Sequence, residues 1–333
     1  MDVGWATFGR ETSRVRFTIP LRGSGGEPVD LRRTIGSHGC VGLAPNRVAP
    51  GDESLTVPVR LRGGRGTLVR IAPGDPGFAA VEAAGVRGAG QQAELTAIVR
   101  HMLGLDADYA PFYARAATDP ALAWVTRGAG RFLRSATAFE DVVKTICTTN
   151  CAWSATQRMT DALVSGLGEP VDGRSGVRLF PTPQALAEAP ESWYRDVARA
   201  GYRGPYLRSI AAAIVRGELD LDRLAKADRA VLSDADLDAE LRALPGVGPY
   251  AAAHIMMLMG RYSRLVFDSW TRPAYARLAG RKPRSDATIE RRFKPYGAFA
   301  GLAFWCYVTS DWFDDKAEPA AARTRTSGSS EEA

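Results

Sequence analysis

The residues best suited to chemistry in this sequence are a carboxylate and a glycine-rich turn that precedes it. Asp268 follows Gly248 by 20 residues, and Gly248 closes the run Leu244-Pro245-Gly246-Val247-Gly248. Glycines permit backbone angles and a close approach of ligands that other residues deny. Amide groups at a helix start lack carbonyl partners, and the helix dipole adds positive charge there, so a phosphate fits beside Gly246, Gly248 and Tyr250. A phosphate contact of this kind does not depend on the base sequence. The combination predicts an enzyme that binds DNA.

Two helices must flank this turn. Ser233 and Asp234 supply capping and early acidic side chains, and leucines then recur at helical spacing up to Leu244. Pro249 suits the first turn of a second helix that runs to about Met259. We therefore expect a helix, a tight hairpin and a second helix. A turn that only joins two helices is the alternative, because glycine-rich turns are common.

The run L-P-G-V-G-P-Y-A-A followed by V-F-D-S-W-T-R resembles the helix-hairpin-helix DNA glycosylases, which carry a Gly/Pro-rich loop and then an aspartate. Residues 138–150 look like the first core helix of that family, and residues 201–208 resemble its G-x-R-x-x-Y-I segment. The resemblance covers roughly residues 100 to 312 and is closest to the branch of alkylpurine and 8-oxoguanine glycosylases. It implies a helical core with two subdomains and a cleft between them.

By this resemblance, Asp268 is the catalytic residue. Cleavage of an N-glycosidic bond passes through a sugar with oxocarbenium character, so a carboxylate beside the anomeric carbon stabilises the positive charge and can orient or deprotonate water. An aspartate at this place also fits a purely structural role, as the N-cap of a helix that begins near Ser269. The two roles are compatible, because a cap would fix the position of the carboxylate.

An enzyme of this kind flips the damaged nucleotide out of the duplex and stacks the base against apolar or aromatic walls. Tyr250 and His254 are four residues apart and share a face of the second hairpin helix, which lines the base pocket in the family. Trp305 falls where the 8-oxoguanine enzymes place a stacking aromatic, and Asn150 matches the asparagine that enters the duplex. DNA contacts are thus expected from Gly246, Val247, Gly248, Tyr250 and Asn150. The alternative for Tyr250, His254 and Trp305 is that they are ordinary core residues. The alternative for Asn150 is a helix cap or a turn residue.

The family members that also cut the DNA backbone use a lysine amine at the position of Tyr250. A phenol cannot form a Schiff base with the sugar. The chain has five lysines, none in the hairpin. Lys144 lies in a segment that could approach the site, although a solvated helix face is the expectation for its side chain. The sequence therefore predicts a monofunctional glycosylase of base excision repair that leaves an abasic site.

The substrate expected is an alkylated purine, whose ring charge favours aromatic stacking. The stretch I-C-T-T-N at residues 146–150 favours an 8-oxoguanine-type glycosylase instead. A third alternative is a non-catalytic helix-hairpin-helix DNA-binding protein, which would need neither Asp268 nor a base pocket. The enzyme is the preferred interpretation, because the match extends beyond the hairpin to the aspartate.

The cysteines and histidines of the sequence indicate which metal cofactors the protein could bind. The four cysteines are not the closely spaced set that holds an iron–sulfur cluster, so we predict no such cluster. Three histidines without paired cysteine spacing predict no zinc site. The resemblance implies that the backbone carbonyls of Arg242, Leu244 and Val247 hold a structural monovalent cation, and no other cofactor is expected.

Composition agrees with a DNA-binding protein. The 333 residues are 45% hydrophobic, which supports packed cores and argues against a disorder-dominated chain. The net charge is +6 and 38 of the 43 basic residues are arginine, which suits phosphate contacts. Residues 1–10 lack the apolar core of a signal peptide, and no apolar run has transmembrane length. We expect a bacterial cytoplasmic, nucleoid-associated monomer whose partner is double-stranded DNA containing a damaged base, with no membrane partner.

The chain divides into an N-terminal sheet domain and a helical core. Alternating apolar residues predict strands at 15–21, 55–61 and 68–71, the last two as a hairpin. Helical spacing dominates from residue 91 onward. The fold class expected is α+β, with an antiparallel-sheet domain at 1–90, one helical subdomain at 134–230 and another, carrying the hairpin and Asp268, at 91–133 and 231–313. Residues 314–333 are charged and small and predict a disordered tail.

Overall fold

The computed structural model describes residues 14–48, 53–64, 66–171, 176–280 and 284–312. The expected tail at 314–333 and the N-terminal residues 1–10 lie outside these described residues. Within the described part of the chain, no helix combines the length and the apolar character needed to cross a membrane.

The N-terminal part is a five-stranded antiparallel sheet. In spatial order its strands are β1 (Arg14–Pro20), β5 (Phe78–Ala84), β4 (Gly66–Pro73), β3 (Leu55–Arg60) and β2 (Arg47–Val48). The strands predicted at 15–21, 55–61 and 68–71 are confirmed as β1, β3 and β4. Strand β5 was not predicted, because its sequence FAAVEAA is rich in alanine, which is depleted in strands. A short helix α1 (Leu31–Ile35) and the 3₁₀ turn η1 (Gly39–Gly42) lie between β1 and β2.

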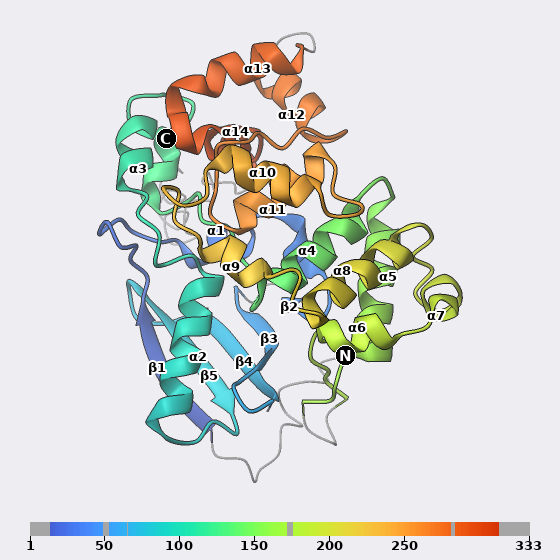
Figure 1. The fold of residues 1–333 in the computed structure, drawn as a ribbon. Coiled ribbons are helices and arrows are strands. Elements are labelled where there is room, and N and C mark those ends of the chain that lie inside the picture. The colour runs from blue at the N-terminus through green and yellow to red at the C-terminus, as the bar shows by residue number, and fades with distance from the viewer. Residues whose placement is uncertain (1–13, 49–52, 65, 172–175, 281–283, 313–333) are drawn as a thin grey trace, which may run out of the picture.

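Helix α2 (Gly88–Met102) covers the sheet, as Figure 1 shows. Its buried residues Leu95, Val99 and Met102 belong to the same hydrophobic cluster as Val57 of β3 and Val81 of β5. The sequence-based boundary at residue 90 assigned this helix to the helical subdomain. Its apolar face packs on the sheet instead, so α2 belongs to the N-terminal unit.

The rest of the described chain is helical and forms two further hydrophobic clusters. Together with the sheet domain, this confirms the α+β class. The first cluster is built from α4 to α11 and the second from α3 and from α11 to α14. The helices before the hairpin are α3 (Ala110–Ala116), η2 (Ala123–Arg127), α4 (Ala138–Thr148), α5 (Trp153–Leu167), α6 (Pro183–Glu188), α7 (Glu191–Asp196), α8 (Arg203–Val215) and α9 (Leu221–Lys226). Those from the hairpin onward are α10 (Asp234–Arg242), α11 (Pro249–Leu258), α12 (Thr271–Leu278), α13 (Asp286–Phe293), η3 (Lys294–Phe299) and α14 (Ala300–Val308).

Helix α11 joins the two helical clusters. Ile255 and Met256 lie in the first cluster, whereas Met257 and Leu258 lie in the second. This position explains why the helix is apolar on every side. Helix α10 places Leu237 in the first cluster. The sequence-based boundary between residues 230 and 231 had grouped α10 with the C-terminal helices, but the hairpin directs its apolar face toward the cluster that contains α4.

Candidate functional site

The predicted helix, hairpin and helix are present as α10, residues 243–248 and α11. The Ser233 hydroxyl caps α10 by accepting from the Asp236 amide at 3.1 Å. In the turn, the Val247 amide donates to the Leu244 carbonyl at 3.1 Å. Gly246 has a φ of +83°, and a β-carbon there would lie 2.7 Å from the Tyr206 ring. Only glycine fits this position without strain.

Gly248 occupies the N-cap position of α11 and is exposed. Among the described residues, no side chain caps this helix end. A β-carbon at Gly248 would meet no atom within 4 Å, so the backbone faces open space. The unpaired amide groups and the positive end of the α11 dipole are therefore accessible to an anion.

The Asp268 side chain holds the turn that leads into α12 with one of its two oxygens. Oδ1 accepts from the Trp270 amide at 2.8 Å and from the Thr271 amide at 2.6 Å, and the Asp268 amide donates to the Thr271 hydroxyl at 2.9 Å. Within the described part of the chain, Oδ2 has no hydrogen-bond partner, and the residue is half-buried. The cap fixes the carboxylate and leaves one oxygen available for chemistry.

Tyr250, at the start of α11, lies within electrostatic range of Asp268. Burial raises the pKa of the Tyr250 phenol to about 12, and the negative charge of Asp268 adds to the effect. Its hydroxyl lies 3.4 Å from that of Thr148 at the end of α4, and its ring stacks on His254 with centroids 6.2 Å apart. The phenol is neutral at pH 7, and the half-buried ring stacks on His254.

His254 and Trp305 lie deeper on the same side. The ring centroids of these two residues are 6.3 Å apart, and both side chains are buried. The Trp305 indole donates to the Ser37 carbonyl at 2.9 Å, which fixes its plane. Burial lowers the pKa of His254 to about 3, so its imidazole is neutral at pH 7. Tyr250, His254 and Trp305 thus form one aromatic group, and their role as walls of a base pocket stays a prediction.

The comparisons with known proteins agree on one fold. The 3-methyladenine DNA-glycosylase from Archaeoglobus fulgidus matches with a TM-score of 0.68 and 18% identity over 90% of this chain and 99% of that one. The 8-oxoguanine glycosylase/lyase of Clostridium acetobutylicum matches with a TM-score of 0.63 and 20% identity over 89% of this chain and 98% of that one in its apo-form. Its complex with double-stranded DNA containing cytosine opposite 8-oxoguanine gives 0.59 and 23%, over 76% and 87%.

The chain has the fold of the helix-hairpin-helix DNA glycosylases.

Sequence comparison adds a curated relative from Bacillus subtilis (strain 168), YfjP, named provisionally as a DNA-3-methyladenine glycosylase. It is 26% identical over 153 residues, which are 44% of this chain and 50% of that protein. The chain therefore matches about half the length of this relative. No family model matches the sequence. At these identities the likeness establishes the glycosylase fold alone.

Two exposed tryptophans near Asp268 were not predicted from the sequence to belong to the site. Trp270 and Trp312 are each 40% exposed, and their ring centroids are 5.3 Å apart. The Trp270 ring is also 6.0 Å from Trp305. The available signal was the position of Trp270, two residues after the aspartate. Together these rings extend the aromatic wall from the buried Trp305 to the surface.

Asn150 follows the C-terminus of α4 and is exposed. Its φ of +48° is left-handed, a conformation that asparagine tolerates better than most residues. The preceding Thr149 carbonyl accepts a hydrogen bond from the Arg203 guanidinium, which ties the end of α4 to α8. Asn150 therefore serves as a turn residue in this structure, and its insertion into DNA stays a prediction.

The expectation for Lys144 was wrong. Its side chain is only 2% exposed and its ammonium lies 2.6 Å from Glu140 Oε1 within α4. A solvated helix face was expected because lysine rarely lies in a core without a partner. The buried carboxylate at i−4 supplies that partner here.

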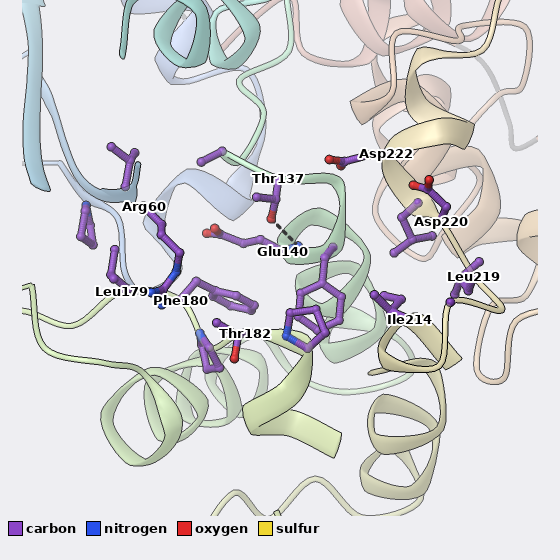
Figure 2. A pocket seen from close by; sticks show the side chains of 18 residues that line it. Arg60, Thr137, Glu140, Leu179, Phe180, Thr182, Ile214, Leu219, Asp220 and Asp222 are labelled. Atoms are coloured by element: carbon purple, nitrogen blue, oxygen red, sulfur yellow. Dashed lines mark hydrogen bonds between the residues drawn. The ribbon is translucent and has the colours of Figure 1, made fainter. Parts of the chain in front are cut away.

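A cavity of about 480 Å³ lies near the other end of α4 (Figure 2). Arg60, Glu140, Asp220 and Asp222 surround it together with apolar side chains. Thr137 lines this cavity, whereas Thr148 contacts Tyr250 eleven residues further along the helix. At 1.5 Å per residue the two ends are about 16 Å apart. The cavity is therefore separate from the site around Asp268.

Proposed function

We propose that this protein is a DNA glycosylase that removes a damaged base from double-stranded DNA by hydrolysing its N-glycosidic bond. The observation that carries the proposal is the Asp268 carboxylate, which is held by two amides through Oδ1 while Oδ2 stays free. Its charge acts on Tyr250, whose helix starts at the open amides of the hairpin. The glycosylase fold and the relative named above support the same assignment.

In the proposed reaction, the negative charge of Asp268 stabilises the oxocarbenium-like sugar as the base departs. The free oxygen Oδ2 orients a water molecule toward the anomeric carbon and accepts its proton. The fixed oxygen Oδ1 holds the group in place, so little reorganisation is needed during the reaction. The products are a free base and an abasic site.

DNA is held in this proposal by contacts that are independent of sequence. The amides at Gly246, Gly248 and Tyr250 bind a backbone phosphate, and Val247 packs the turn against the core. Asn150 fills the space that the flipped base leaves. The carbonyls of Arg242, Leu244 and Val247 bind a monovalent cation between the turn and the phosphate, although the Leu244 carbonyl already accepts one hydrogen bond. The proposed hydrolysis requires no other cofactor.

An alkylated purine is the substrate we favour. Its positive ring charge suits a pocket of aromatic rings. The second candidate is 8-oxoguanine, favoured by the exposed asparagine after Ile146-Cys147-Thr148-Thr149. We further propose that the protein acts as a monomer on the bacterial chromosome in the cytoplasm.

A panel of duplexes with single lesions tests this function. The protein should release the free base from a duplex with 3-methyladenine or 7-methylguanine faster than from one with 8-oxoguanine, with chromatography of released bases as the readout. Faster release of 8-oxoguanine would select the second candidate. Tight binding to all duplexes with no release from any lesion would identify a non-catalytic DNA-binding protein and refute the proposal.

The aromatic residue at position 250 leads to a separate prediction about strand cleavage. A phenol cannot form the Schiff base with the sugar that an amine forms, and the Lys144 amine is buried against Glu140. Borohydride added to the protein with an abasic duplex should therefore trap no covalent adduct. A bifunctional 8-oxoguanine glycosylase/lyase serves as the positive control. A strong adduct with this protein would overturn the monofunctional assignment.

A further inference from the structure

Three side chains that bind metals in other proteins meet beneath the aromatic group. His38, Cys40 and His254 each offer one ligand atom, and these atoms lie within 4.8 Å of one another. All three residues are at most 9% exposed. The sequence predicted no zinc site, because Cys40 and His254 are more than two hundred residues apart and show no recognisable spacing. The folding of η1 against α11 brings them together.

The second observation is that His254 lacks partners. Both of its ring nitrogens are buried, and neither has a hydrogen-bond partner among the described residues. A buried polar group without a partner costs free energy, so an unmatched imidazole requires an explanation. A metal ion would use one of these lone pairs directly.

We propose that His38, Cys40 and His254 bind a zinc ion. Two imidazoles and one thiolate are a ligand set that zinc favours, with a fourth tetrahedral position left for water or another ligand. Zinc bonds of about 2.0–2.3 Å place neighbouring ligand atoms about 3.5 Å apart. Side-chain movements of about 1 Å therefore close the present arrangement around an ion.

The hydrogen bonding of His38 fits this role. Its Nε2 lies 2.7 Å from the Leu133 carbonyl, which can only accept, so Nε2 carries the proton. That tautomer leaves a lone pair on Nδ1, which now accepts weakly from the Cys40 amide at 3.3 Å. Histidines that bind metals characteristically donate their other nitrogen to a carbonyl or carboxylate in this way.

Cys40 must lose its proton to bind. Burial raises the pKa of the Cys40 thiol to about 12 in the metal-free protein, so the thiol is neutral at pH 7. Zinc binding replaces the S–H bond by an S–Zn bond and releases one proton to the solvent for each ion. The positive charge of Lys144 lies near Cys40 and would repel a zinc ion. The Glu140 carboxylate, 2.6 Å from the Lys144 ammonium, offsets this positive charge.

The experiment uses the full chain, stripped with a chelator and titrated with zinc or with cobalt as a spectroscopic substitute. One equivalent should bind, and the cobalt form should show thiolate-to-metal charge-transfer absorption. Cys40→Ser and His38→Gln should each weaken zinc binding by more than the roughly 10- to 100-fold that loss of an outer-shell partner costs. The matched controls Cys151→Ser and His101→Gln change the same residue types outside the cluster and should leave affinity unchanged.

Circular dichroism establishes that each variant is folded. Failure of the wild-type protein to bind one equivalent, or unchanged affinity in folded Cys40→Ser, would refute the site. These readouts measure metal content and absorption, so they do not depend on glycosylase activity. Zinc binding would support the site even if the protein released no base. Base release without zinc binding would refute the site and leave the proposed function intact.

Discussion

Asp268→Asn is expected to lower the rate of base release by at least about 10²- to 10³-fold while leaving DNA affinity nearly unchanged. The asparagine oxygen can still accept from the Trp270 and Thr271 amides that hold Oδ1 at 2.8 and 2.6 Å, and asparagine caps helices as well as aspartate. The substitution removes the negative charge and the proton acceptor but keeps the cap. Single-turnover release of a labelled base, with affinity measured on the same duplex, separates these effects.

Asp268→Ala is the companion variant. It removes both the charge and the two hydrogen bonds that hold the start of α12, and loss of such a capping interaction costs about 1 kcal/mol of stability. The alanine variant should therefore lose both activity and thermal stability, whereas the asparagine variant should lose activity alone. If Asp268 is only a cap, the asparagine variant will release base at the wild-type rate, and the catalytic assignment will be wrong.

Gly248→Trp is expected to weaken binding to every duplex alike by about tenfold or more, equivalent to about 1.4 kcal/mol. Gly248 has a φ of −86°, which any residue adopts, and its β-carbon position is empty, so the free protein should fold normally. The indole would occupy the space where a phosphate approaches the amides of α11. Affinities for undamaged, alkylated and oxidised duplexes, measured at one salt concentration, provide the test.

Gly246→Ala is the contrast within the same turn. A methyl group there would lie 2.7 Å from Tyr206 at a φ of +83°, so this variant should lose about 1 kcal/mol or more of folding stability. Thermal unfolding should then distinguish the two glycines, since Gly248→Trp should keep the wild-type midpoint. A loss of affinity confined to one lesion would contradict a phosphate contact that is blind to sequence.

The local parts of this site were predictable from the sequence. The hairpin is encoded by adjacent residues, from the Ser233 cap to Pro249 at the start of α11. Tyr250 and His254 share a helix face, so their stacking follows from helical spacing. The strands β1, β3 and β4 alternate clearly enough to be found.

The parts that depend on tertiary packing were not predictable. Lys144 is buried because α4 is enclosed by neighbouring helices, which no local pattern reveals. Strand β5 forms from an alanine-rich segment because β1 and β4 pair with it on both sides. The meeting of His38 with His254 depends on how the N-terminal unit packs against α11. In each case the tertiary environment overrides the intrinsic preference of the segment.

A crystal structure of the Asp268→Asn variant bound to a duplex with an alkylated purine would show where residue 268 acts. We expect a nucleotide extruded from the duplex, with its anomeric carbon about 3–3.5 Å from the side-chain atom that replaces Oδ2 or from a water held by it. The hairpin amides at Gly248 should contact a phosphate of the same strand. A complex in which residue 268 faces the protein interior, far from any sugar, would contradict a catalytic role for Asp268.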